Sequence, residues 1–158
     1  MAKDTKTNAM RILEQKGIDF RVNLYSCEEF VDAIHIADML GQEYENSFKT
    51  LVAVGKSGSH YVFVVPIAEE LDLKKAARSV GEKAVELIHV KELFALTGYI
   101  RGGCTPIGMK KQFATVVDET AQLFDEIIIS GGRIGAQILM DPMDLERVIP
   151  CKFEDITV

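Results

Sequence analysis

The chain has 158 residues, a length typical of one domain. Hydrophobic residues make up 47% and charged residues 27%, values close to the globular average, so a disordered or fibrous chain is not expected. The 24 acidic and 18 basic residues give a formal charge of −6, which disfavours general binding to DNA or to an anionic membrane. A polyanionic partner would therefore need a local basic patch.

The three cysteines and the N-terminal sequence indicate a cytoplasmic protein. Cys27, Cys104 and Cys151 are far apart and form no CxxC pair, which suits neither a disulfide framework nor a four-cysteine metal site. The first seven residues are polar and resemble no secretory signal, and no apolar run is long enough for a membrane helix. No metal or organic cofactor is predicted.

The first half of the chain contains helices and a hairpin. Apolar periodicity predicts a helix over 5–16, a strand over 18–25, a helix over 33–40 capped by Asp32 and Gly41, paired strands at 48–54 and 60–65, and a helix over 71–80 with Leu73, Ala76, Ala77 and Val80 inward. Strand alternation places Lys49 on the same face as Leu51 and Ala53. Burial of its ammonium requires a carboxylate, a phosphate or cleft water, whereas a lysine at a sheet edge is the ordinary alternative.

The second half of the chain adds more short strands. The pattern predicts a strand over 84–89, a helix over 91–97, strands over 114–117, 126–129 and 137–140, a turn at 130–133, and a last helix opened by Asp141 and Pro142. Helices interspersed with adjacent strand pairs favour a mixed α/β (α+β) fold. We therefore expect one compact domain over 1–158, with a mixed sheet and flanking helices.

A glycine-rich loop is the strongest chemical signal. Gly102-Gly103-Cys104-Thr105-Pro106 combines permissive glycines with a rigid proline, which suits the presentation of backbone N–H groups to an anion or oxyanion. A tight turn explains the composition equally well. The chain has neither a Walker loop nor a GxGxxG fingerprint.

Two other kinds of site have weaker support. Cys104 could be the nucleophile of an acyl or thioester hydrolase, but no nearby base is evident in the sequence. The three histidines, His35, His60 and His89, are too far apart for a helical metal pair and are predicted to be structural or surface residues. The sequence alone therefore favours structural roles for Cys104 and for the three histidines.

Basic residues gather in the middle of the chain. Residues 71–111 contain 8 basic and 4 acidic side chains, whereas residues 112–158 contain 3 and 9. A candidate phosphate-binding face consists of Lys74, Lys75, Arg78, Lys110 and Lys111. An ordinary solvated lysine surface is the alternative.

Several segments together resemble one family along nearly the whole chain. They are Phe48-Lys49-Thr50-Leu51, Val65-Pro66-Ile67-Ala68, Leu71-Asp72-Leu73-Lys74-Lys75-Ala76, Gly98-Tyr99, residues 102–111 and Ser130-Gly131-Gly132-Arg133. The sequence is similar to the YbaK/ProX family of aminoacyl-tRNA deacylases, and among them to the bacterial Cys-tRNA(Pro) deacylases. The resemblance implies a partly barrel-like sheet, related to the editing insertion of bacterial prolyl-tRNA synthetases.

The resemblance also implies an activity, trans-editing, which is the hydrolysis of the ester of a mischarged tRNA, with Cys-tRNA(Pro) as the expected substrate. It implies no cofactor, and a prolyl-tRNA synthetase is a candidate partner. In cysteine-specific members, the thiol of the substrate attacks its own ester. A non-enzymatic module that binds a nucleotide or aminoacyl-tRNA is the alternative.

The family motifs also imply roles for individual residues. Lys49 matches the essential lysine and anchors the ribose or terminal phosphate. Gly102 begins the catalytic GxxxP loop, in which Gly103, Cys104 and Thr105 offer backbone amides to the ester carbonyl. The implied substrate pocket contains Tyr25, Phe30, Thr50, Pro106 and Gln137. Gln137 stands where many relatives have an aspartate, a departure that bears on amino-acid specificity.

Overall fold

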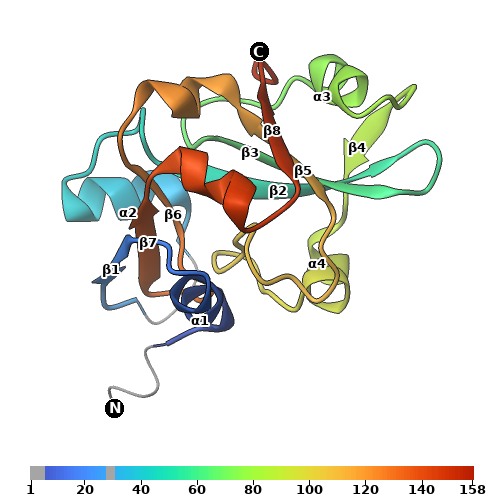
Figure 1. Ribbon diagram of the computed structural model, residues 1–158. Coiled ribbons are helices and arrows are strands. Elements are labelled where there is room, and N and C mark those ends of the chain that lie inside the picture. Colours follow the sequence, from blue (N-terminus) through green and yellow to red (C-terminus); the bar gives the residue numbers. More distant parts are fainter. Residues whose placement is uncertain (1–5, 28–30) are drawn as a thin grey trace.

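The computed structural model describes residues 6–27 and 31–158. In chain order its elements are α1 Asn8–Gln15, β1 Phe20–Leu24, α2 Ala33–Leu40, β2 Phe48–Gly55, β3 His60–Pro66, α3 Leu73–Ser79, β4 Val85–Leu87, α4 Val90–Thr97, β5 Ala114–Asp118, the 3-10 helix η2 Glu119–Leu123, β6 Ile127–Ser130, β7 Ala136–Met140, the 3-10 helix η3 Pro142–Arg147 and β8 Cys151–Glu154. This mixture of helices and short strands confirms the predicted α/β class (Figure 1).

The strands form two sheets that are joined at one point. The larger sheet has the order β4-β2-β3-β5-β8 and the smaller sheet has the order β1-β7-β6. The hairpin β2–β3 is antiparallel, as predicted, whereas β5 pairs in parallel with both β3 and β8. A parallel bridge between Ser47 and Ile128 connects the start of β2 to β6, so the two sheets form a partly barrel-like surface.

Both faces of the larger sheet are covered. Alternation along β2 places Val52 in one apolar core and Ala53 in another. Helix α1 packs into the Val52 core, and Leu93 and Leu96 of α4 pack against it. Helix α3 covers the opposite face through Ala76 and Ala77. This double covering explains why the central strands β2 and β3 are apolar on both sides.

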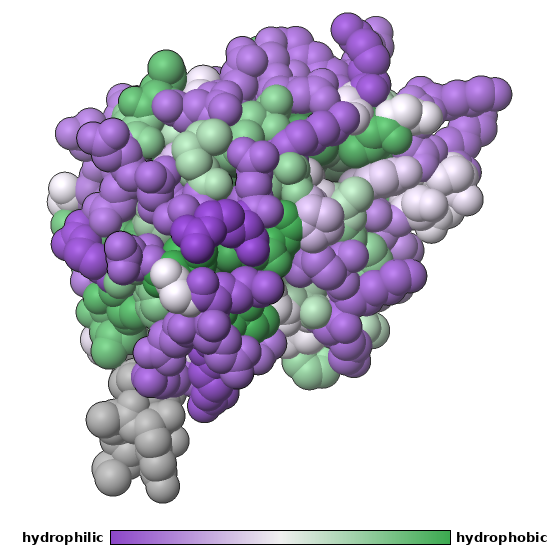
Figure 2. All heavy atoms as spheres, in the orientation of Figure 1, coloured by the Kyte–Doolittle hydropathy of each residue, from purple (hydrophilic) through white to green (hydrophobic). Residues whose placement is uncertain are grey.

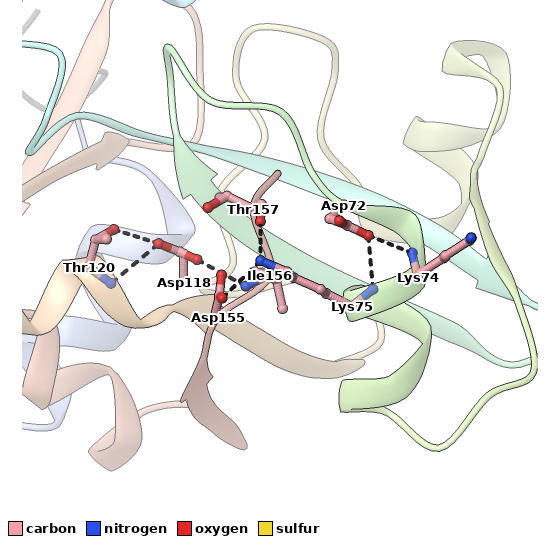
Figure 3. Close-up of polar contacts among 8 residues, drawn as sticks. All are labelled: Asp72, Lys74, Lys75, Asp118, Thr120, Asp155, Ile156 and Thr157. Carbon is pink, nitrogen blue, oxygen red and sulfur yellow. Dashed lines mark hydrogen bonds and ion pairs between the residues drawn. The ribbon is translucent and has the colours of Figure 1, made fainter.

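The end of the chain is attached to α3 (Figure 3). Ile156 is fully buried, its carbonyl accepts from the amide of Asp72 at 2.8 Å, and its own amide donates to Asp118 Oδ1 at 3.1 Å. Lys75 Nζ donates to the carbonyl of Thr157 at 2.8 Å, and it also bonds Asp155. Residues 155–158 therefore complete the core beneath α3.

Three sequence expectations differ from the structure. The segment after Asp141 forms a 3-10 helix rather than an α-helix, although Asp141 caps it as predicted. Strand β8 was not predicted, although its four residues alternate between apolar and charged side chains. Leu73, predicted to point inward, is 45% exposed, whereas Ala76 and Ala77 of the same helix are buried as predicted.

Polar side chains cover most of the face that Figure 2 shows, and apolar atoms form separate patches between them.

No helix among the described residues is long and apolar enough to span a membrane.

Candidate functional site

A cavity of about 320 Å³ lies where α2, the start of β2, the β6–β7 hairpin and the loop after α4 meet. It brings together residues that are far apart in the sequence. Its lining includes Tyr25, Asp32, Gln42, Lys49, Thr50, Arg101, Gly102, Cys104, Ser130 and Gln137. Six of the residues predicted for the site therefore lie around one cavity.

The cavity lies beside a gap in the pairing of β2. The carbonyl of Ser47 accepts from Ile67 at 2.9 Å, so the odd-numbered residues of β2 bond to β3. The backbone N–H and C=O groups of the even-numbered residues point to the other edge of β2. There β4 pairs with the C-terminal end of β2, and β6 bridges to its N-terminal end. Among the described residues, the bridge to β6 is centred on Ser47 and the pairing with β4 begins at Ala53, so Thr50 lies between these two partners beside the cavity.

Lys49 is a half-buried cation in this wall. Its Nζ donates to the carbonyl of Ile67 at 3.3 Å. Burial lowers the pKa of the ammonium, and the neighbouring carboxylates of Glu70 and Glu69 oppose this effect. A single long hydrogen bond leaves the Lys49 ammonium able to donate to a ligand in the cavity.

Thr50 supplies a second polar group. Its Oγ1 is buried and has no hydrogen-bond partner among the described residues. Buried hydroxyls are nearly always paired, so an unpaired one at a cavity is a candidate ligand contact.

The glycine-rich loop forms another part of the wall, but its amides are not equivalent. The Gly103 amide donates to the carbonyl of Ile100 at 2.9 Å and closes a turn, so it is not available to an oxyanion. Gly103 and Thr105 are buried and do not line the cavity, and neither does Pro106. Within the described chain, the amides of Gly102 and Cys104 have no hydrogen-bond acceptor, and both residues line the cavity.

Close packing fixes this loop. A Cβ at Gly103 would lie 2.9 Å from the Cα of Arg133, in the turn between β6 and β7. The Tyr99 hydroxyl also donates to the carbonyl of Ile107, and burial raises the pKa of Tyr99 to about 12. The loop is therefore held from both sides.

The Cys104 thiol is poorly suited to nucleophilic attack. It is 9% exposed, and burial raises its pKa to about 12. Nucleophilic cysteines need a lowered pKa or an adjacent base, and no histidine is among the described residues that line the cavity. The geometry disfavours the hydrolase that depends on Cys104.

Gln137 lies in a network of amide side chains. Its Oε1 accepts from Gln42 Nε2 at 2.7 Å and from Asn23 Nδ2 at 3.0 Å, and its Nε2 donates to Gln42 Oε1 at 3.1 Å. The wall at this position is therefore neutral and is tied to the end of α2. Tyr25, at the end of β1, lies in the same wall, and burial raises its pKa.

The sequence did not identify all of the lining residues. Gln42, Asp32, Arg101 and Ser130 were not predicted as site residues, and for Gln42 the only signal was its place directly after the cap at Gly41. Phe30, predicted for the pocket, lies outside the described residues.

The five predicted tRNA-binding cations do not form one continuous face. Lys74, Lys75 and Arg78 belong to α3, on one side of the larger sheet, and Lys75 is engaged by Asp155. Lys110 lies on the opposite side, where its Nζ is 5.9 Å from the ring centroid of Phe94 in α4, and Lys111 follows it. In Figure 1, α3 is at the upper right and α4 is at the lower right, with β2 and β3 between them in height.

Comparisons with known proteins agree on one family. Residues 27–148 match the family model of the aminoacyl-tRNA editing domain. A protein of Enterococcus faecalis, EbsC, named as a proposed Cys-tRNA(Pro)/Cys-tRNA(Cys) deacylase, is 46% identical over 153 residues, or 96% of this chain and 93% of that protein.

Solved structures share the fold. A crystal structure described as a proposed trans-editing enzyme for prolyl-tRNA synthetase has a TM-score of 0.83 and 28% identity, covering 96% of this chain and 95% of its own. The crystal structure of hypothetical protein APE2540 has a TM-score of 0.88 at 22% identity, covering 96% and 100%. The second likeness concerns the fold alone.

Proposed function

The chain belongs to the aminoacyl-tRNA editing domain family, and on this premise we propose that it hydrolyses the ester of mischarged Cys-tRNA(Pro) in trans. One observation carries the proposal: one cavity is lined by a half-buried ammonium and by a hydroxyl and two loop amides that have no hydrogen-bond partner among the described residues. These groups can bind an ester and its ribose without supplying a nucleophile.

Positioning the ester is the first task of the site. The amides of Gly102 and Cys104 bind the carbonyl oxygen and stabilise the negative charge that develops on it. The Lys49 ammonium binds the ribose or the terminal phosphate, and the Thr50 hydroxyl bonds to the substrate. Tyr25 and Gln137 close the part of the cavity that receives the amino-acid side chain.

The nucleophile is the thiol of the cysteinyl substrate. Its sulfur forms a bond to the ester carbonyl carbon, and the bond between that carbon and the ribose oxygen breaks. The ribose oxygen leaves with the electron pair and takes up the proton that the thiol has lost. The products are deacylated tRNA and a cyclic thioester of cysteine, which water opens.

Such a hydrolase meets a general need. Packing alone rejects a side chain of similar size by only about 10- to 200-fold, so a second hydrolytic site improves fidelity. Its substrates place the reaction in the cytoplasm, where prolyl-tRNA synthetase is the candidate partner that supplies mischarged tRNA.

The test is a single-turnover deacylation assay with purified protein. Cys-tRNA(Pro) should be hydrolysed, and correctly charged Pro-tRNA(Pro) should not. Ser-tRNA(Pro) should react much more slowly, because its hydroxyl is far less acidic than a thiol of nearly the same volume. Equal rates with Cys-tRNA(Pro) and Ser-tRNA(Pro) would assign the attack to water. If no substrate is hydrolysed, the protein is a non-enzymatic binding module and the proposed activity is wrong.

A further inference from the structure

The surroundings of the cavity differ sharply in charge from one side to the other. On one side, residues 31–47, which include α2, contain four acidic and no basic residues, and residues 66–72 contain three and none. On the other side, residues 98–111 contain Arg101, Lys110 and Lys111 and no acidic residue. A polyanion that enters this cavity is therefore repelled from the α2 side and attracted to the side of the glycine-rich loop.

An exposed aromatic surface adjoins the basic side. Phe94 is 59% exposed and Val90, one helical turn earlier, is 57% exposed. Phe94 is the most exposed phenylalanine of the described chain, and the Lys110 ammonium lies 5.9 Å from its ring centroid. Together these three residues, which we call the Phe94 platform, combine an exposed aromatic side chain with a cation over one face of its ring.

The platform is connected directly to the cavity. The Gly98 amide donates to the carbonyl of Phe94 at 2.8 Å, and the Lys110 amide donates to the carbonyl of Thr97 at 2.8 Å. Four residues after Gly98 the same segment lines the cavity at Gly102. A chain of this length spans at most about 15 Å, which a few unstacked nucleotides can cover.

We infer that the Phe94 platform binds the unpaired 3′ end of the tRNA whose terminal nucleotide occupies the cavity. A base stacks on the Phe94 ring, and Lys110 contacts the adjoining phosphate. Single-stranded RNA ends are commonly bound in this way, by aromatic rings for the bases and basic residues for the backbone. This inference rests on the proposed function and adds the path along which the RNA leaves the site.

The test uses uncharged tRNA(Pro) with its complete 3′ end and the same tRNA with the unpaired 3′ nucleotides removed. Fluorescence anisotropy at low salt should show tighter binding of the complete tRNA to the wild-type protein. Phe94→Ala should weaken binding of the complete tRNA by about 5- to 150-fold, the range found when a stacking aromatic is removed. It should leave binding of the shortened tRNA unchanged, and Phe94→Tyr should retain the preference.

Met39→Ala is the matched control, because Met39 is similarly exposed, at 58%, but belongs to α2 on the acidic side. It should change neither affinity. Equal binding of the two tRNAs by wild type, or an unchanged preference in Phe94→Ala, would overturn the inference. These binding measurements need no hydrolysis, so a failure of the proposed deacylation would be seen separately.

Discussion

At the scale of single residues, Cys104 lines the cavity but has a thiol that burial makes a poor nucleophile. We propose that its amide binds the ester carbonyl there, while its thiol remains protonated because burial raises the pKa to about 12. A serine at this position keeps the amide. We expect Cys104→Ser to retain most of the deacylation rate, measured by single turnover with Cys-tRNA(Pro). A nearly inactive, folded variant would assign the attack to this thiol.

The same thiol predicts a pH dependence of stability. Its pKa in the folded protein, about 12, is above the ordinary value of 9.0, so its contribution is fully present below pH 9 and is lost as the pH rises from 9 towards 12. The loss is at most about 1.4 kcal/mol per pH unit. Urea unfolding between pH 8 and 10.5 should therefore show a smaller decline for Cys104→Ala than for wild type, and parallel declines would contradict this assignment.

Lys49 is expected to reduce stability while serving function. Burial lowers its pKa, which means that the folded state disfavours the ammonium relative to water. Lys49→Met keeps the length of the side chain and removes the charge. The variant should unfold at the same or a higher temperature than wild type and should lose deacylation activity. An active Lys49→Met protein would show that Lys49 has no essential role in the site.

At the scale of elements, the glycine-rich loop and the β6–β7 turn are packed together at Gly103. An alanine Cβ there would lie 2.9 Å from the Cα of Arg133, and backbone cannot move aside as a flexible side chain can. We expect Gly103→Ala to lower the unfolding free energy by about 1–3 kcal/mol and to slow deacylation. Gly17→Ala is the control for stability, because a Cβ at Gly17 meets no atom within 4 Å and only its φ of +69° is strained.

The amide network joins α2 to β7. Gln42 and Gln137 bond reciprocally, so removing one side chain leaves the other without its partner. A double-mutant cycle with Gln42→Met and Gln137→Met should give a coupling of about 1 kcal/mol in urea unfolding. Additive effects would show that the two amides are hydrated independently.

Local patterns predicted most elements but not how they meet. The caps at Asp32 and Gly41, the β2–β3 hairpin and the turn at 130–133 follow from short-range signals, and the structure confirms them. The hydrogen bond from the Gly103 amide to the Ile100 carbonyl depends on the geometry of the turn, which the amino-acid composition of the loop does not determine. The unpredicted pairing of β8 with β5 joins segments far apart in the chain, which a local pattern does not record.

At the scale of the whole molecule, the placement of charge matters more than its sum. The cations of α3 and those after α4 lie on opposite sides of the larger sheet, so sequence proximity suggested a single face that the fold divides. The cavity lies beside the segment that carries the cations after α4, because Arg101 and Gly102 of that segment line it.

This division predicts unequal salt effects. Each phosphate that a cation neutralises contributes about −0.7 to −0.9 to the slope of log K against log salt. Replacing both Lys110 and Lys111 by alanine should make the slope for tRNA binding less steep by about one to two. Replacing both Lys74 and Arg78 is the matched control and should leave it unchanged; the reverse result would move the tRNA to α3.

The attachment of residues 155–158 to α3 has a consequence for synthesis on the ribosome. Ile156 fills the core beneath α3, and the Val158 amide donates to the carbonyl of Glu70 at 3.0 Å. While residues 156–158 are still inside the exit tunnel, that core lacks one of its fully buried side chains and α3 lacks its tether. The nascent chain therefore completes its fold only after these residues emerge, and a ribosome that stalls before them would hold an unfinished protein with apolar surface exposed.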